Sequence, residues 1–503
     1  MMKLLTPKFL PLFSKRLSIG VLALVLSACA TQQSKVNADL ESFKRGNLAQ
    51  TISGLDESIP AKNNVYYLER GTVLRLMGQS RIPTSSQSLL LTDQVLRQSE
   101  LKRMSLKASV NALGDYLIAE NLLDKDYELK GYEGSLLAYH IALNHVLQGD
   151  WDNGRVEVMK MVKREQDLAS YNNIKYQALQ MERTKVSQAN RTNIDNRFMA
   201  GNPMIGGYPV NTLTDPEVNT LKNSYQSAAA HYLAGFIFEK LKEGSLAAPG
   251  YRQAIELRPE LAFLKQGLNN LDSNLNKSTD ASVGGSTDTL VVIETGFLPL
   301  IDNFKVNIPI PIGNVMKFAT VSYPRIQPNT EKYYPNQLRI DSTTLVPEMI
   351  TSVDAMARKD LKDAMPGYVL RASSRAFTQV LAQVAAEQAA MAGSRDKNQS
   401  AALGALASLV TGITMSAISS ADVRHWSSLP SNIFMVRVNV PNGLRDFSIM
   451  TPAGIMSGRK INFSGDKALV YVRLFRDRAT IMSSGDLSSG FQNLPQPIAG
   501  VLR

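Results

Sequence analysis

Four histidines and a few clustered acidic residues are the side chains of this sequence best suited to acid–base or metal chemistry. His140 and His145 are five positions apart and do not share a helix face, and no His-Glu-x-x-His motif occurs, so we expect no zinc site. Asp422 and His425 lie beside Ser427, which suggests a charge relay, but no nucleophile elbow accompanies them. We therefore expect packed histidines rather than a catalytic centre.

Three neighbouring aspartates, Asp354, Asp360 and Asp363, form the other candidate site, because two carboxylates could hydrolyse a glycan. Basic residues alternate with them, as on a solvated helix face: Arg358, Lys359 and Lys362. Neither of the glycine-rich motifs that cradle nucleotide phosphates occurs in the chain. The sequence therefore predicts no catalytic residue, no metal and no cofactor, and it favours a binding role.

The single cysteine, Cys29, is the residue with the clearest chemistry. Residues 1–28 combine four basic residues with the apolar run 17–26, which is typical of a signal peptide. The run ends in Leu26-Ser27-Ala28-Cys29, which resembles the lipobox of bacterial lipoproteins. This resemblance implies cleavage before Cys29 and its acylation, for example with palmitate, and several acyl chains anchor a protein stably.

Charge and the residue after the lipobox suggest where the protein acts. Ala30 follows Cys29, whereas an Asp there would resemble an inner-membrane retention signal of lipoproteins. We therefore expect the protein on the periplasmic face of the outer membrane. The chain has a net charge of +11, and the basic excess of the mature chain lies in its C-terminal part. We expect envelope proteins as partners, with peptidoglycan or anionic lipid as further contacts, and no nucleic acid.

Helical periodicity predicts an all-α region over residues 37–272, after a short tether at 29–36. One segment has the spacing that resembles a tetratricopeptide repeat: Gly235, Phe238, Ala247, Tyr251, Ala254 and Pro259. Pro249-Gly250 departs from that pattern and predicts an interruption of the second helix. Trp151 follows a Gly149-Asp150 turn, where an exposed aromatic side chain could anchor a partner. A Gly/Pro-rich insertion at 192–223 could be a lid or a partner-binding loop, or simply mobile.

A polar linker at 273–288 precedes the C-terminal region 289–503, where strand patterns occur early and late. Asn442-Gly443 and Gly465-Asp466 are hairpin signals, so we expect a small antiparallel sheet or sandwich. A helical insertion is predicted at about 352–420. Its charge-free part, 398–421, is expected to be a buried helix, with membrane contact as the alternative. The predicted fold class is thus α+β, with a tetratricopeptide-like array followed by an antiparallel β domain.

Several short segments together resemble a largely uncharacterised family of proteobacterial lipoproteins with an N-terminal repeat region: Tyr132–Tyr139, Leu290–Glu294 and Trp426–Pro430. From the architecture we expect an outer-membrane adaptor or scaffold that binds proteins through its helices and supports envelope or peptidoglycan assembly. Two alternatives stay open: a component of an export or translocation apparatus, and a cell-wall hydrolase.

Overall fold

The computed structural model describes residues 38–58, 62–106, 109–119, 127–190, 210–275, 285–312, 315–392 and 421–484. The proposed signal peptide, Cys29, the tether, the first part of the 192–223 insertion, most of the linker and residues 393–420 lie outside the described residues. In the described part the chain is α+β, as the sequence predicts.

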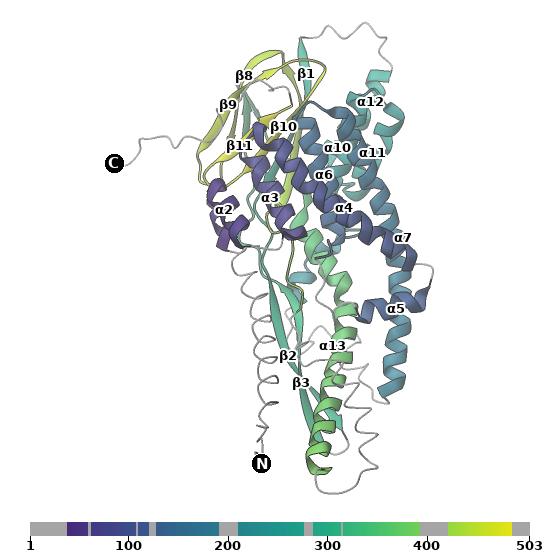
Figure 1. Ribbon diagram of the computed structural model, residues 1–503. Helices are drawn as coiled ribbons and strands as arrows, with labels where there is room; N and C mark the ends of the chain where they lie inside the picture. Colours follow the sequence, from purple (N-terminus) through teal and green to yellow (C-terminus); the bar gives the residue numbers. More distant parts are fainter. Residues whose placement is uncertain are drawn as a thin grey trace, which may run out of the picture.

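The N-terminal half is helical, and its helices stack side by side along one flank of the molecule (Figure 1). The principal helices are α2 (Leu48–Ser58), α3 (Asn64–Leu76), α4 (Ile82–Leu106), α5 (Val110–Ala119), α6 (Gly131–Leu147), α7 (Trp151–Asn190), α10 (Ala228–Lys240), α11 (Gly244–Leu257) and α12 (Ala262–Leu275). The insertion before α10 carries one further short helix, α9 (Pro216–Asn219).

The hairpin of α10 and α11 shows how local sequence sets the helix ends. The Ser227 hydroxyl accepts the N–H of Ala230 and caps α10. Contrary to our expectation, Pro249 does not interrupt α11, which runs unbroken through it. Gly250 lies at the contact with α10, because a Cβ there would lie only 2.8 Å from the backbone nitrogen of Gly235. The two glycines therefore allow the helices to approach closely.

The C-terminal half contains two sheets that pack face to face. The five-stranded sheet has the order β11 (Ala479–Ser483), β10 (Lys467–Leu474), β1 (Ser286–Thr295), β7 (Asn432–Pro441) and β6 (Glu348–Ser352). The four-stranded sheet has the order β5 (Thr343–Leu345), β4 (Leu338–Ile340), β8 (Gly443–Met450) and β9 (Met456–Phe463). An apolar core between them includes Val291, Phe434 and Phe447. A sandwich was expected, but β1 and β10 run parallel, so the larger sheet is mixed.

Both hairpin signals mark passages between sheets instead of hairpins. Asn442-Gly443 joins β7 of the larger sheet to β8 of the smaller one, and Gly465-Asp466 joins β9 back to β10. Gly443 has φ +103° and Gly465 has φ +82°, values that glycine adopts without strain. The signals thus located the reversals of the chain correctly but assigned the wrong strand partners.

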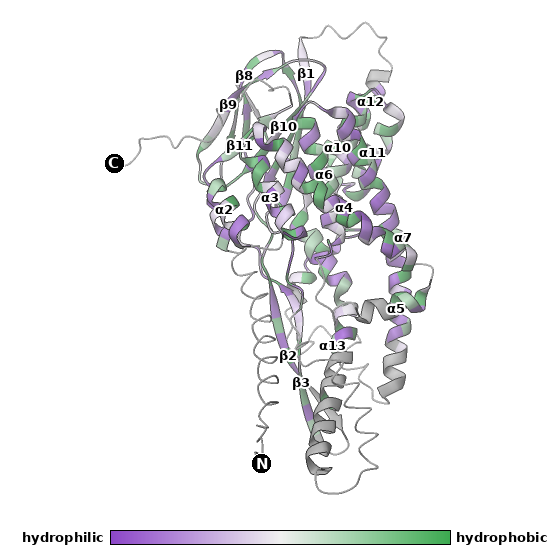
Figure 2. Ribbon diagram, in the orientation of Figure 1, coloured by the Kyte–Doolittle hydropathy of each residue, from purple (hydrophilic) through white to green (hydrophobic). Residues whose placement is uncertain are grey.

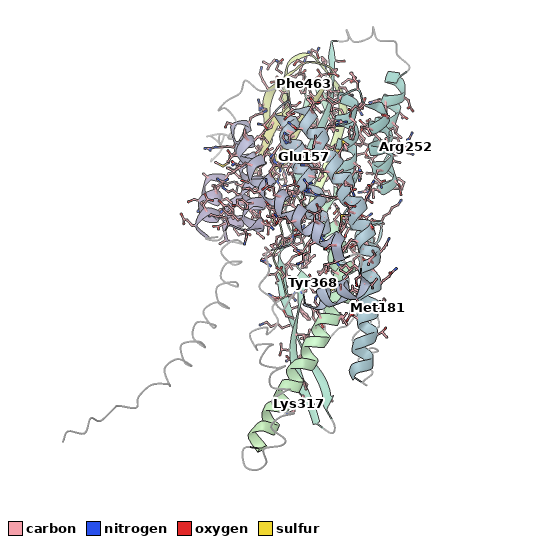
Figure 3. All side chains as sticks on the ribbon, turned by 45° about the vertical axis from the view of Figure 1, so that its right-hand side comes forward. Glu157, Met181, Arg252, Lys317, Tyr368 and Phe463 are labelled. Carbon is pink, nitrogen blue, oxygen red and sulfur yellow. The ribbon has the colours of Figure 1, made fainter. Side chains whose placement is uncertain are left out.

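A two-stranded ribbon, β2 (Ile301–Ile312) and β3 (Val315–Ile326), leaves the sandwich and extends away from the body (Figure 1). The long helix α13 (Val353–Ala392) runs beside it, which confirms the first part of the predicted helical insertion. Figure 3 places Lys317 toward the free end of the ribbon and Phe463 at the opposite end of the molecule. Among the helices that the structure describes, none is both long and apolar enough to cross a membrane.

Helices and sheet share one continuous apolar core. It joins residues of α6 and α10, such as Leu136 and Leu233, to Leu290, Met435 and Tyr471 of the larger sheet. Figure 2 shows the apolar residues of α6 and α10 in this region. The two halves of the sequence therefore pack as one body across the position where the composition suggests a linker.

Candidate functional site

Buried carboxylates of the helices hold the segment that leads into β7. The Glu69 side chain, fully buried on α3, accepts the backbone N–H groups of Ser427 at 2.6 Å and Ser428 at 3.1 Å. Glu133 on α6 accepts the N–H of Trp426 at 2.9 Å. Burial raises the pKa of Glu69 from 4.5 to about 7, and the hydrogen bonds from the serines only partly offset it. These contacts fix segment 426–428 to the helices.

Deeper in the same junction lies a buried polar group with two arginines and one glutamate. Arg75 donates to Nδ1 of His140 at 2.7 Å, and Glu294 of β1 accepts the Tyr471 hydroxyl at 2.6 Å. Arg473 lies 3.6 Å from Glu294 and donates to the carbonyl of Gly296. Burial and the Arg75 charge hold the pKa of His140 well below its usual range, so this histidine is neutral. The group is inaccessible to solvent and links helices to sheet.

A second ionic group joins α10 to the three central strands of the larger sheet, β10, β1 and β7. Arg437 donates to Glu239 at 2.8 Å and to Asp288 at 2.6 Å, and Lys467 contacts the same two carboxylates at 2.9 and 2.5 Å. The Tyr251 hydroxyl donates to Glu239 at 2.6 Å. Two cations thus balance two anions. Tyr251, selected from the sequence for helix packing, also belongs to the contact between helices and sheet.

The suggested charge relay at Asp422, His425 and Ser427 is not assembled. Nε2 of His425 lies 3.2 Å from the Ser427 hydroxyl, but its Nδ1 faces the backbone carbonyl of Val423. The Asp422 carboxylate pairs with Arg424 at 2.9 Å. His425 and Ser427 are both buried, and burial lowers the pKa of His425 to about 4. The arrangement lacks the acid that would orient the imidazole as a base.

The three aspartates on α13 also have separate partners. Asp354 pairs with Lys332 at 2.8 Å and Arg358 at 2.7 Å, and Asp363 pairs with Lys359 at 3.0 Å. Asp360 accepts the Ser224 hydroxyl at 3.3 Å, and burial raises its pKa to about 6. The three carboxylates therefore do not converge on one substrate position. Arg358 also contacts Asp215 and, at 3.0 Å, Glu217, which fixes the described end of the 192–223 insertion on α13.

Trp151 is not the exposed anchor that we expected. Its side chain is 9% exposed and packs against Phe236 of α10, with the ring centroids 6.2 Å apart. The turn before α7 thus directs the indole inward, where it fills the space between two helices.

The six repeat positions lie together on the α10–α11 hairpin and its end. Ala247, Tyr251 and Ala254 are fully buried, and Phe238 is 6% exposed. A Cβ on Gly235 would lie 2.7 Å from the ring of Tyr251, so the glycine makes room for the aromatic ring. Pro259 follows the end of α11 at Leu257. The hairpin is therefore tightly packed, with α12 against its open side.

The remaining histidines have local partners as well. His231 contacts Glu165 at 2.8 Å inside the helical half, and His145 contacts Asp150 at 3.2 Å at the end of α6. Within the part of the chain that the structure describes, no group of His, Cys, Asp and Glu side chains could hold a metal ion.

The helical half has an open pocket between α4, α6 and α7. Its empty volume, which includes the open solvent at its mouth, is about 490 Å³. Apolar side chains form part of its wall, and Gly131 and Gly134 leave space at the start of α6. The apolar lining consists of Leu96, Met104, Leu129, Leu168 and Tyr171.

Charged groups at the pocket wall are held in place by ion pairs. Arg164 contacts Glu100 at 2.9 Å and Asp93 at 2.5 Å, and Glu165 accepts the Ser135 hydroxyl at 2.7 Å. Burial raises the pKa of Glu100 in spite of the nearby Arg164. Lys130 donates to the backbone carbonyl of Arg424 at 2.6 Å. The pocket thus combines an apolar wall with preorganised charges of both signs.

Sequence reasoning missed this pocket because its residues come from three helices with no common motif. A weak signal was available at Gly131 and Gly134, since two glycines in the first turn of an otherwise apolar helix leave the backbone uncovered. The buried acids Glu69 and Glu133 gave no signal of their own, because their partners at 426–428 are remote in sequence.

No protein-family model matches the chain. No curated protein matches it either. Among solved structures, a tetratricopeptide repeat protein from Parabacteroides merdae ATCC 43184 is similar over 48% of this chain and 99% of its own, at 16% sequence identity and a TM-score of 0.13. At this TM-score the likeness supports no inference about fold or function. The resemblance to a lipoprotein family therefore stays a prediction from the sequence.

Proposed function

We propose that the protein is a lipid-anchored adaptor on the periplasmic face of the outer membrane, which binds a protein partner through its helical half. The observation that carries the proposal is the open pocket between α4, α6 and α7, with its apolar wall and its fixed charges. Such a lining suits side chains of a peptide or helix, because apolar burial supplies affinity and the charges select the partner.

The helical half also has the rigidity that a docking surface needs. We infer that α10 and α11 form a tetratricopeptide-like pair, supported by the close approach of Gly235 to the Tyr251 ring. Buried carboxylates connect this half to the sheet, so a partner bound in the pocket would be held at a fixed orientation to the sandwich. An adaptor of this kind would support envelope or peptidoglycan assembly by positioning its partner near the membrane.

In-cell photo-crosslinking with the full chain tests the partner site. A benzoylphenylalanine at Met104, which is 44% exposed at the pocket, is compared with one at Leu246 on α11, which is 37% exposed. We expect a light-dependent crosslinked complex with a partner protein at position 104 and none at position 246. The same products at both positions, or none at 104, would contradict the pocket as the binding site.

Acylation is tested separately by mass spectrometry of the N-terminal peptide. We expect a mature chain that begins at acylated Cys29, whereas a Cys29→Ala variant should retain its leader. An unmodified Cys29 in the wild-type chain would disprove the anchor, without affecting the result at Met104.

A further inference from the structure

The two faces of the β2–β3 ribbon differ sharply. In an antiparallel ribbon, residues paired across the strands project to the same face. One face of β3 carries Ala319, Val321 and Tyr323, which are at most 2% exposed beside α13. The opposite face carries Met316 and Phe318, which are 53% and 60% exposed. The ribbon is therefore packed on one side and open on the other.

The open face changes character along its length. Toward the body it presents exposed polar residues, namely Lys305, Asn307 and Thr320. Toward the free end it presents Phe318 and Met316, whose cross-strand partners in the register are Pro309 and Pro311. This change from polar to apolar residues is confined to the end of the ribbon that is farthest from the sandwich (Figure 1).

Composition at the ribbon end favours a lipid surface over another strand or an acidic partner face. Pro309 and Pro311 have no N–H, so β2 cannot offer a complete edge to a further strand. Residues 303–324 contain no acidic residue, and Lys305 lies on the open face, which suits anionic lipid head groups. Exposed Phe and Met side chains are the kind that enter the boundary between head groups and acyl chains.

The length of the chain before residue 38 supports the same conclusion. Phe43 packs against Phe297, just before β2, with the ring centroids 5.4 Å apart, so the described chain starts near the base of the ribbon. The residues from Cys29 to Ala38 span at most about 30 Å when extended. The twelve residues of β2 span about 40 Å. The extended tether is about 10 Å shorter than β2, so a lipid on Cys29 and the ribbon end reach the same bilayer when the ribbon is tilted toward the membrane plane.

We propose that the free end of the ribbon, through the exposed Met316 and Phe318, docks on the surface of the bilayer that holds acylated Cys29. This inference rests on the proposed lipid anchor and adds a second membrane contact to it. Two contacts at different points of the body would fix its orientation to the membrane, which one flexible tether cannot do.

Depth-dependent fluorescence quenching tests the proposal on the full lipoprotein. Because Cys29 is the single cysteine and acylation removes its thiol, Phe318→Cys introduces a unique labelling site. The matched controls are Thr320→Cys, exposed on the same face, and Leu444→Cys, which is 62% exposed on β8. Each is labelled with a nitrobenzoxadiazole dye and reconstituted into vesicles of phosphatidylethanolamine and phosphatidylglycerol that carry doxyl lipids.

We expect quenching at position 318 to exceed that at 320 by about twofold or more, since docked apolar side chains lie roughly 5–10 Å below the head groups. Position 444 should show none. Equal signals at 318 and 444, or crosslinking between two copies at 318 without quenching, would overturn the proposal. If mass spectrometry finds Cys29 unmodified, the anchor is wrong, and the same comparison in a Cys29→Ser chain still decides whether the ribbon binds lipid.

Discussion

The junction between helices and sheet and the free end of the ribbon place charged and apolar side chains in opposite ways. At the junction, charges such as Lys467 and Glu239 are buried and paired with each other. At the ribbon end, Phe318 and Met316 are exposed although they are apolar. Each arrangement costs free energy unless something else offsets it. At the junction, opposite charges within the fold offset the cost of burying each charge. At the ribbon end, only a surface outside the fold can offset the cost of exposing the apolar side chains.

This difference also decides which experiments are meaningful. A chain cut at Asp272 would appear to isolate the helical half, but it would remove Arg437 and Lys467 from Glu239, and Ser427 from Glu69. Loss of partner binding on such truncation would report damage to the helices. Point variants in the full chain are therefore needed. Variants at the junction should lower the stability of the protein, and variants at the ribbon end should leave it unchanged.

Breaking the ionic group at Arg437 should have the largest effect. We expect Arg437→Met to lower the free energy of unfolding by about 3–5 kcal/mol, because Glu239 and Asp288 then share one cation in a buried site. Denaturant unfolding measures this loss. The matched control is Arg445→Ala, whose guanidinium lies 3.4 Å from Asp341 at a partly exposed site, and it should change stability by less than about 1 kcal/mol. Similar losses of unfolding free energy in both variants would show that the buried ionic group stabilises the protein no more than the partly exposed pair does.

Titration of Glu69 should give the next largest effect. Its pKa is raised from 4.5 to about 7, so the folded state binds the proton more tightly than the unfolded state. The Glu69 contribution is therefore most favourable below pH 4.5 and is lost as the pH rises toward 7, by up to about 3 kcal/mol.

The pH dependence of Glu69→Gln isolates this contribution. His140 and His425 have lowered pKa values and oppose Glu69 by favouring folding as the pH rises, but they are present in both chains. We expect the stability of the wild type relative to Glu69→Gln to decrease between pH 4.5 and 7, as measured by denaturant unfolding. A difference that does not vary with pH would show that folding does not raise the pKa of Glu69.

A smaller effect is expected where two helices approach. Gly235→Ala places a Cβ 2.7 Å from the Tyr251 ring, which should cost about 1–3 kcal/mol in overpacking, partly offset by the better helix propensity of Ala. Thermal unfolding should show a lowered Tm. Gly285→Ala serves as the control, because nothing lies within 4 Å of a Cβ there and its Tm should stay unchanged.

The sequence predicted the elements better than their partners. The apolar runs at 289–294 and 432–440 correctly indicated strands, because an apolar strand needs only its own residues to be recognised. The parallel pairing of β1 with β10 was not foreseen, because strand order depends on contacts between remote segments. For the same reason Glu69 could not be matched to Ser427, which is 358 residues away. The pocket between α4, α6 and α7 was also missed, because its lining comes from three helices that are separate in sequence.

The smallest effect on stability should come from the ribbon end. A Met316→Glu and Phe318→Glu double variant removes two large apolar side chains, but both are more than half exposed and contribute little to the core. We expect the free energy of unfolding to change by less than about 0.5 kcal/mol. In the vesicle assay, the same variant should abolish quenching of a dye at position 320. Stability that falls as far as in Arg437→Met would instead show that the ribbon end is packed within the fold, and the contrast with the junction would fail.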